Sequence, residues 1–208
     1  MKKLLFMAIA AFLMVGVAGN SQSKKQLKGI QKMAVAAAKK DKKDGFTNLE
    51  MGSTEFLFEK YLTKTTIAAD GEKPMKGLVG VAYNVSSLNL AKQNAIQNAI
   101  VEYANQRSGM IKGRAVSEMV NKSEKQVDDF IAAYERILVH KITGELQVEV
   151  TVYREKRKLF DVKAYCVVDW EAARQANAEA LKQALEEQEL YHEFGTRASE
   201  WIDEGLVD

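Results

Sequence analysis

The segment LQVEVTVYREKRKLFDVKAYCVV, residues 146–168, decides the fold. Apolar and polar residues alternate over 145–153 and again over 159–168, and a short charged link, 154–158, joins the two runs. Alternation with a period of two is typical of half-buried strands, and so short a link joins antiparallel neighbours. We therefore predict an antiparallel hairpin with one buried face and one largely wet face.

The alternation also assigns side chains to the two faces of the hairpin. A slip of one residue would turn every buried side chain to water, so the pattern predicts the register strongly. Thr151 falls on the wet face. The buried face is predicted to hold Val148, Val150, Val162 and Cys166.

Helices at 88–106 and 124–139 are predicted to cover the buried face. In the first, a stripe of small residues at steps of four suits close approach to a sheet (Ala91, Ala95 and Ala99). We expect this helix to stop at 107–109. The second helix opens with the capping box of Ser123 and Gln126.

A third strand and a final helix complete the predicted domain. Residues 77–85 alternate as a strand, and Gly80 within it indicates that another element packs very closely there. Asp169 is placed to cap a helix that begins at Trp170 and breaks at Gly195. The order of elements predicts an α+β fold: a two-layer sandwich of a small, mainly antiparallel sheet with helices on one face.

Upstream, the chain begins like a secretory signal peptide. Lys2 and Lys3 precede an apolar run from Leu4 to Val17, which is shorter than the about 20 apolar residues that span a bilayer. Small residues then offer a cut after Ala18 or Gly19. We divide the chain into a signal peptide at 1–19, an N-terminal helical and basic segment at 20–76, and the α+β domain with its C-terminal helix at 77–208.

Charge is distributed unevenly along a nearly neutral mature chain. The whole chain carries a formal net charge of +2, and the predicted leader holds two lysines and no acidic residue. Residues 24–43 hold Asp41 as their single acid, whereas 186–208 are acidic. These ends either attract one another, face different partners, or are two solvated helical faces. The lysines of 24–43 are Lys24, Lys25, Lys28, Lys32, Lys39, Lys40, Lys42 and Lys43.

Two pairs of residues have the residue types of chemical sites. Cys166 and His140 have the residue types of a thiol nucleophile and its base, but Cys166 shares the phase of Val162, which favours a buried hydrophobic role. Glu189 and His192 have the spacing that presents two metal ligands on one helical face, but the motif occurs once. We assign no catalytic, cofactor-binding or metal residue, and we expect no cofactor.

A cluster of basic residues forms the predicted hairpin tip. Such a tip can contact phosphates or acidic lipids, or serve only solubility. Aromatic residues that would stack on bases are few nearby, so no nucleic-acid partner is expected. The cluster comprises Arg154, Lys156, Arg157 and Lys158.

The segment from Gly77 to Ala173 resembles the domain of the Lpp-type twenty-kilodalton envelope lipoproteins of Gram-negative bacteria. The resemblance rests on the strand ending near Asn84, the helix at 91–99, and the strand at 160–168 with a helix directly after it. The region upstream resembles the leading segment of exported proteins from gut anaerobes. The resemblance implies an accessory envelope protein without a catalytic residue set. The lipid-bearing cysteine of that family is missing here, because Cys166 is the single cysteine.

Three functional hypotheses follow from these observations. The first is a non-enzymatic protein of the periplasm or another exported compartment, whose partner is an envelope protein or a second copy. The second is a peripheral binder of a membrane surface or anionic envelope polymer through residues 24–43. The third is an enzyme that uses scattered carboxylates as acid and base.

Overall fold

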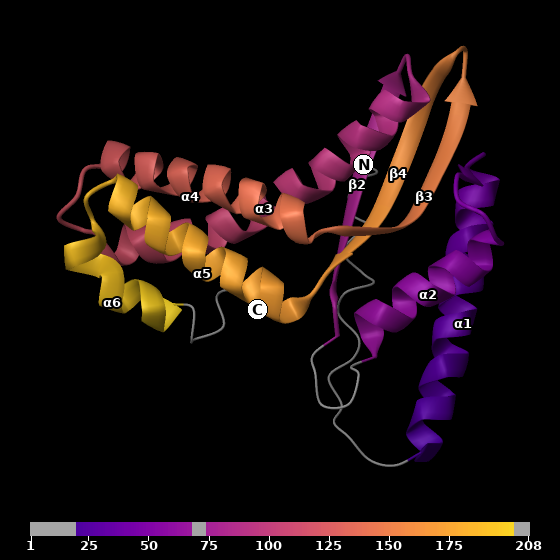
Figure 1. Ribbon diagram of the computed structural model, residues 1–208, viewed down its shortest axis with the longest axis horizontal. Helices are drawn as coiled ribbons and strands as arrows, with labels where there is room; N and C mark the ends of the chain where they lie inside the picture. Colours follow the sequence, from indigo (N-terminus) through magenta and orange to yellow (C-terminus); the bar gives the residue numbers. More distant parts are fainter. Residues whose placement is uncertain (1–19, 68–73, 202–208) are drawn as a thin grey trace.

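The computed structural model describes residues 20–67 and 74–201 (Figure 1). The predicted leader, 1–19, lies outside the described residues, as do 68–73 and 202–208. No helix among the described residues is both long enough and apolar enough to cross a membrane.

A four-stranded antiparallel sheet with the order β1-β3-β4-β2 forms the centre of the fold. The strands are β1 (Thr47–Asn48), β2 (Lys76–Val85), β3 (Gln147–Lys156) and β4 (Leu159–Val168). β3 and β4 form the predicted hairpin around Arg157 and Lys158, whose φ angles of 53° and 63° are those of a two-residue turn. The hairpin and the α+β class are confirmed.

One face of the sheet is covered by α3 (Leu88–Glu118), which folds back over β2. Ser87 caps its first turn by accepting a hydrogen bond from Leu90 N. A Cβ on Gly80 would collide with the backbone of Ala95 and Ala99, so the predicted close approach is confirmed. Only glycine leaves room for the helix at this point of the strand.

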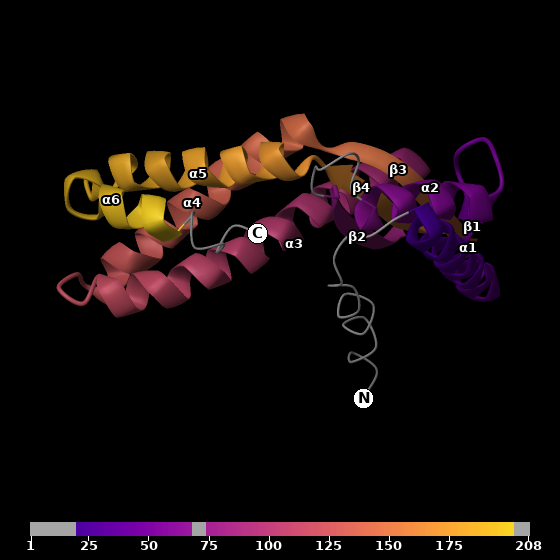
Figure 2. The same cartoon turned by 90° about the horizontal axis from the view of Figure 1, so that it is seen from below.

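Beyond the sheet, α3 packs with α4 (Glu124–Glu145), α5 (Trp170–Glu187) and α6 (Tyr191–Trp201) in a helical bundle (Figures 1 and 2). The capping box of Ser123 and Gln126 and the cap at Asp169 are both present. The expected stop at 107–109 was wrong, because Ser108 is buried against α4 and the buried Ile111 prolongs the packing face. Tertiary packing thus overrides local propensity.

The break in the C-terminal helix also differs from the prediction. α6 runs through Gly195, and α5 ends instead before Glu189, which has a φ of 56°. A left-handed residue closes a helix because its backbone can no longer continue the helical path.

The opposite face of the sheet carries α1 (Asn20–Lys43) and α2 (Thr54–Thr66). The sheet is therefore covered on both faces, whereas helices were expected on one. The second layer arises because β4 is apolar on its other face as well, at Val167 and Tyr165, and this surface needs a cover. The buried residues here are Ala34, Ala38, Phe46, Leu57, Phe58, Tyr61, Val150, Val152 and Val167.

A β-bulge in β3 overturns part of the predicted alternation. Val148 pairs with Cys166, but Val150 pairs with Tyr165, so one extra residue inverts the phase beyond Val148. Val150 therefore faces α1 and α2 rather than α3. Thr151, expected on a wet face, is fully buried opposite Ala164. Val162 and Cys166 face α3 as predicted, while Val148 is 38% exposed.

Candidate functional site

The thiol of Cys166 and the imidazole of His140 do not form a nucleophilic pair. Cys166 is fully buried in β4, and burial raises the pKa of its thiol to about 12. His140 lies on the exposed side of α4. The interpretation of Cys166 as a small buried hydrophobic residue is confirmed.

Glu189 and His192, to which no metal was assigned, are also separated. His192 lies in α6, but Glu189 lies in the link before it, so the two do not share a helical face. Within 20–67 and 74–201, no three side chains of His, Cys, Asp or Glu are grouped as metal ligands.

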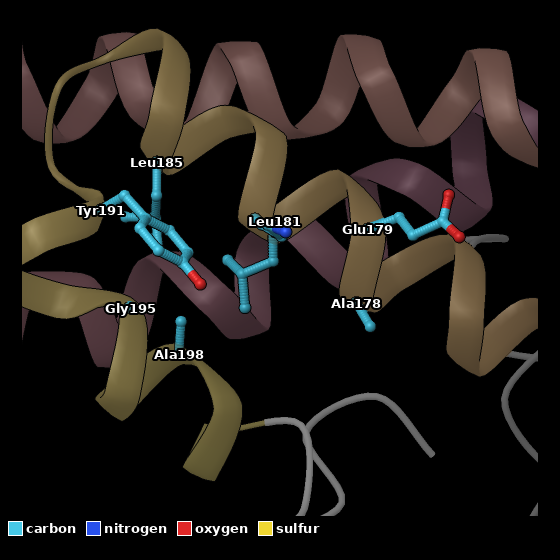
Figure 3. Close-up of a pocket in the computed structure, with 8 residues that line it drawn as sticks. Ala178, Glu179, Leu181, Leu185, Tyr191, Gly195 and Ala198 are labelled. Atoms are coloured by element: carbon cyan, nitrogen blue, oxygen red, sulfur yellow. The ribbon is translucent and has the colours of Figure 1, made fainter.

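A small groove lies between α5 and α6 (Figure 3). Its volume is about 230 Å³, below the roughly 300–1,000 Å³ of typical ligand pockets. Glu179 and Lys182 are its charged lining residues, and most of the other lining residues are apolar. The lining also includes Ala178, Leu181, Leu185, Tyr191, Gly195 and Ala198.

A buried polar network holds the bundle together. Tyr134 donates to Asn177 Oδ1 at 2.7 Å, and Asn177 Nδ2 donates to the hydroxyl of Tyr103 at 2.8 Å and to the carbonyl of Ala173 at 2.6 Å. Burial raises the pKa of Tyr134 well above its usual range. The network joins α3, α4 and α5. Each buried polar atom named here has a hydrogen-bond partner, so the network has a structural role.

The surface with the clearest capacity for binding is the outward side of α1, which we call the lysine face. All eight lysines between residues 24 and 43 are exposed. The opposite side of the helix is buried at Ile30, Ala34, Ala38 and Asp41, which follow one another at steps of three or four. This spacing turns the lysines to solvent together along the helix.

Asp41, the single acid of α1, is used to attach the helix to the sheet. Its carboxylate pairs with Lys163 Nζ at 2.5 Å and accepts a hydrogen bond from the Tyr165 hydroxyl at 3.2 Å. Asp41 and Lys163 are both buried. Burial, and then the nearby Asp41 carboxylate, raises the pKa of Tyr165 well above its usual range. The acid is thereby removed from the exposed side of α1.

The hairpin is joined to the end of α1 by Arg154. Its Nη1 donates to the carbonyl of Asp44 at 2.9 Å, and its Nε pairs with Asp161 at 2.8 Å. Burial opposes ionisation of Asp161, but hydrogen bonds from Asn84 N and Arg154 outweigh it and lower its pKa. The ring of Phe46 lies 4.6 Å from the Arg154 guanidinium and 4.1 Å from Lys163 Nζ.

These contacts bring the basic hairpin tip beside the C-terminal end of the lysine face. Lys156, Arg157 and Lys158 are exposed, and Arg154, two residues before them, bonds the end of α1. The two basic segments that the sequence suggested separately therefore lie next to each other.

The acidic part of the chain lies at the far end of the molecule. The exposed acids of α5, α6 and the link between them sit on the bundle, whereas α1 lies beyond the sheet (Figures 1 and 2). The suggestion that the two ends attract one another within a molecule is therefore wrong for the described residues. These acids are Glu186, Glu187, Glu189, Glu193 and Glu200.

Sequence reasoning missed the anchor of α1. Asp41 continues the buried steps of Ile30, Ala34 and Ala38, which is a signal that this carboxylate turns inward. Its partner Lys163 lies on the β4 face that was expected to be wet. Because the sequence pattern did not predict the second helical layer, it offered no partner for Asp41 on that face.

Comparison of the chain with protein-family models found no match, and comparisons with curated proteins and with solved structures found none either.

Proposed function

We propose that this protein is a non-enzymatic protein of the cell envelope that attaches to an anionic membrane surface through the lysine face. The observation that carries the proposal is the arrangement of α1, which exposes eight lysines and buries its one acid against Lys163. The predicted leader and the resemblance to envelope lipoproteins support an exported location. Electrostatic attachment would stand in for the lipid that those proteins carry.

The shape of the lysine face suits an extended surface. α1 has 24 residues and at 1.5 Å per residue is about 36 Å long. Each basic residue close to an anionic bilayer contributes about 1 kcal/mol, so several lysines together hold a folded domain there. Ala34 and Ala38 of α1 pack on α2 and the sheet, and Leu27, Met33 and Val35 are about 40% exposed, so charge supplies most of the attachment.

The opposite charges at the two ends would orient the bound molecule. An anionic surface attracts the lysine face and the hairpin tip and repels the acidic end of the bundle. The bundle would then stand away from the membrane, where its surface is free to meet other envelope components.

Vesicle sedimentation tests the proposal. The purified protein should pellet with vesicles containing phosphatidylglycerol and remain in the supernatant with pure phosphatidylcholine. Binding should fall in 0.5 M salt, roughly three times the physiological concentration, because the charges are exposed and screened. Replacing Lys25, Lys28 and Lys32 together by Gln should weaken binding on the order of a hundredfold.

A matched variant separates the lysine face from net charge. Lys125, Lys182 and Arg197 are exposed on α4, α5 and α6, and their replacement by Gln removes the same number of charges. This variant should bind like the unaltered protein. Equal losses in both variants would contradict a localised surface. Binding to a soluble polyanion without binding to vesicles would instead favour an anionic envelope polymer.

A further inference from the structure

Three apolar side chains are exposed along the line where α1 meets α2. Leu27 and Val35 of α1 are 40% and 38% exposed, and Phe56 of α2 is 62% exposed. The packing of α2 does not account for Phe56, because this helix packs through another side, at Leu57 and Tyr61. We call Leu27, Val35 and Phe56 the seam residues.

A hydrogen bond between the two helices shows how the seam residues lie. Gln31 Nε2 of α1 donates to Glu59 Oε1 of α2 at 3.0 Å. Leu27 and Val35 lie one turn before and one turn after Gln31, so the three share one line along α1. α2 returns alongside α1 in the opposite direction (Figure 1), and Phe56 lies one turn before Glu59. Phe56 therefore lies on the Val35 side of this bond.

A line of lysines borders the seam on α1. Lys24, Lys28 and Lys32 follow one another at steps of four, and each lies three residues before a member of the line just described. Residues three apart are neighbours on a helix surface. The seam residues therefore lie along one edge of the lysine face. The two acids of α2 are Glu55 and Glu59, and Glu59 is already bonded to α1.

We propose that Phe56 enters the headgroup region of an anionic bilayer, with Leu27 and Val35 beside it, when the lysine face attaches. This inference rests on the function proposed above and names the part of the protein that enters the lipid. Surface-bound helices combine lysines with Phe and Leu, whose apolar parts lie at the boundary between headgroups and acyl chains. The apolar stems of the lysines can lie along the same boundary while their ammonium groups stay beside the lipid phosphates.

The backbone at Phe56 is held in place by the protein itself. Ser53 caps α2 by accepting a hydrogen bond from Phe56 N at 3.2 Å. The loop before it is closed by Asn48, whose Nδ2 donates to the carbonyl of Gly52 at 2.7 Å and to that of Glu50 at 3.2 Å. Little backbone order has to be gained here on binding, which favours affinity.

The surroundings of Phe56 fit a bilayer better than a second copy or another protein. A twofold contact through Phe56 would bring two lysine faces together, and like charges repel. A stable protein interface buries on the order of 800 Å² on each partner, whereas the seam offers three partly exposed side chains. An anionic bilayer supplies negative charge at its surface and apolar atoms beneath, which match the lysines and the seam residues together.

Vesicle binding of Phe56→Ser tests the inference, with Val116→Ser as its control. Val116 is 58% exposed in the bundle part of α3, so both changes remove an exposed apolar side chain. Phe56→Ser should weaken binding to phosphatidylglycerol vesicles about tenfold. The dependence of its affinity on salt should stay unchanged, because no charge is lost. Val116→Ser should bind like the unaltered protein.

The outcomes separate this inference from the proposed function. If the unaltered protein binds the vesicles and Phe56→Ser binds equally tightly, the seam residues do not enter the lipid and the attachment through the lysine face stands. If the unaltered protein does not bind at all, both are overturned. A dimer that forms without vesicles and is dissociated by Phe56→Ser in sedimentation equilibrium would assign the seam to a second copy and overturn the inference.

Tryptophan quenching gives a second measurement, which decides if Phe56→Ser fails to fold by circular dichroism. In Phe56→Trp bound to vesicles, the added fluorescence should be quenched by lipids that carry bromine on their acyl chains near the headgroups. Val116→Trp should show no quenching beyond that of Trp170 and Trp201, which both variants contain. A bound Phe56→Trp whose added fluorescence is not quenched would overturn the inference.

Discussion

The two helical layers attach to the sheet in physically different ways. α3 lies on β2 through Gly80, Ala95 and Ala99, with backbone against backbone. α1 and α2 lie on the other face with buried charges beside their apolar contacts: Asp41 binds Lys163, and Glu149 binds Lys64 at 2.6 Å. The second oxygen of Glu149 is 3.3 Å from Lys60 Nζ, an ion-pair contact without hydrogen-bond geometry.

The difference explains what each layer contributes. Close packing of small residues tolerates no added atom, and it does not depend on charge, so the α3 layer is held by its shape. A buried ion pair adds little net stability, yet it fixes geometry because each partner is costly to leave alone. In α1 the pair acts together with the buried Ala34 and Ala38 to hold the lysine face toward solvent. The contacts of α1 with the sheet therefore orient the lysine face, on which the proposed function depends.

The largest loss of unfolding free energy is expected in β3 just beyond the bulge, where successive side chains point to opposite helical layers. Val150→Asp and Thr151→Asp should each cost about 4 kcal/mol of unfolding free energy, because both side chains are fully buried and neither site offers an evident partner for a new carboxylate. Val148→Asp should cost less than about 1 kcal/mol, since Val148 is partly exposed. Urea unfolding of the three variants gives the comparison.

These variants also test the bulge itself. Without it, Val148 and Val150 would share a face and Thr151 would face the other way. A loss at Val148 as large as that at Val150 would mean that the strand alternates regularly and that the bulge is absent.

The α3 layer can be broken by a single methyl group. Gly80→Ala should cost about 3 kcal/mol, because its Cβ meets the backbone of Ala95 and Ala99 and the helix must shift. Gly113→Ala on α3 is the matched control, since a Cβ there has open space; helix propensity predicts a gain of up to about 1 kcal/mol. Thermal melts of both variants check the pair, and a harmless Gly80→Ala would show that α3 lies farther from β2.

The layer formed by α1 and α2 should lose stability when one buried charge is removed and the side-chain volume is kept. Asp41→Asn should cost about 2 kcal/mol, because Lys163 would remain buried without its counter-ion. Proteolysis and hydrogen exchange should show α1 opening more readily while the bundle stays protected. Asp44→Asn, an exposed acid just after α1, should change neither. Equal opening of α1 and the bundle would mean that the two layers unfold as one unit.

Much of the fold could be predicted from local patterns. The hairpin, the close approach at Gly80 and the caps at Ser123 and Asp169 are each encoded within a few residues of where they act. The extension of α3 past Gly109 could not be predicted this way, because Ile111 and Ser108 are helical through contacts with α4. The bulge could not be predicted for the same reason: an inserted residue is recognised only once the partner strand is known.

The candidate surface was predictable only in part. The lysines of 24–43 and the basic tip were recognised as clusters, but their position side by side depends on the bond from Arg154 to Asp44 O. That bond joins residues far apart in the sequence. The inward turn of Lys163 on a strand face expected to be wet depends likewise on a second helical layer, which single-strand alternation does not reveal.

The smallest expected effect concerns Cys166, which lies in the sheet between the two layers. Cys166→Ala should cost about 1 kcal/mol, for the loss of a small buried group. Burial raises the pKa of the thiol from 9.0 to about 12, so the stability held by the protonated thiol is complete below pH 9 and is lost as pH rises toward 12. The alanine variant should lose this part of the alkaline decline. In the native protein the thiol should react with a thiol reagent only as fast as the sheet opens. Rapid reaction at pH 8 would mean that the α3 layer is not closed over β4.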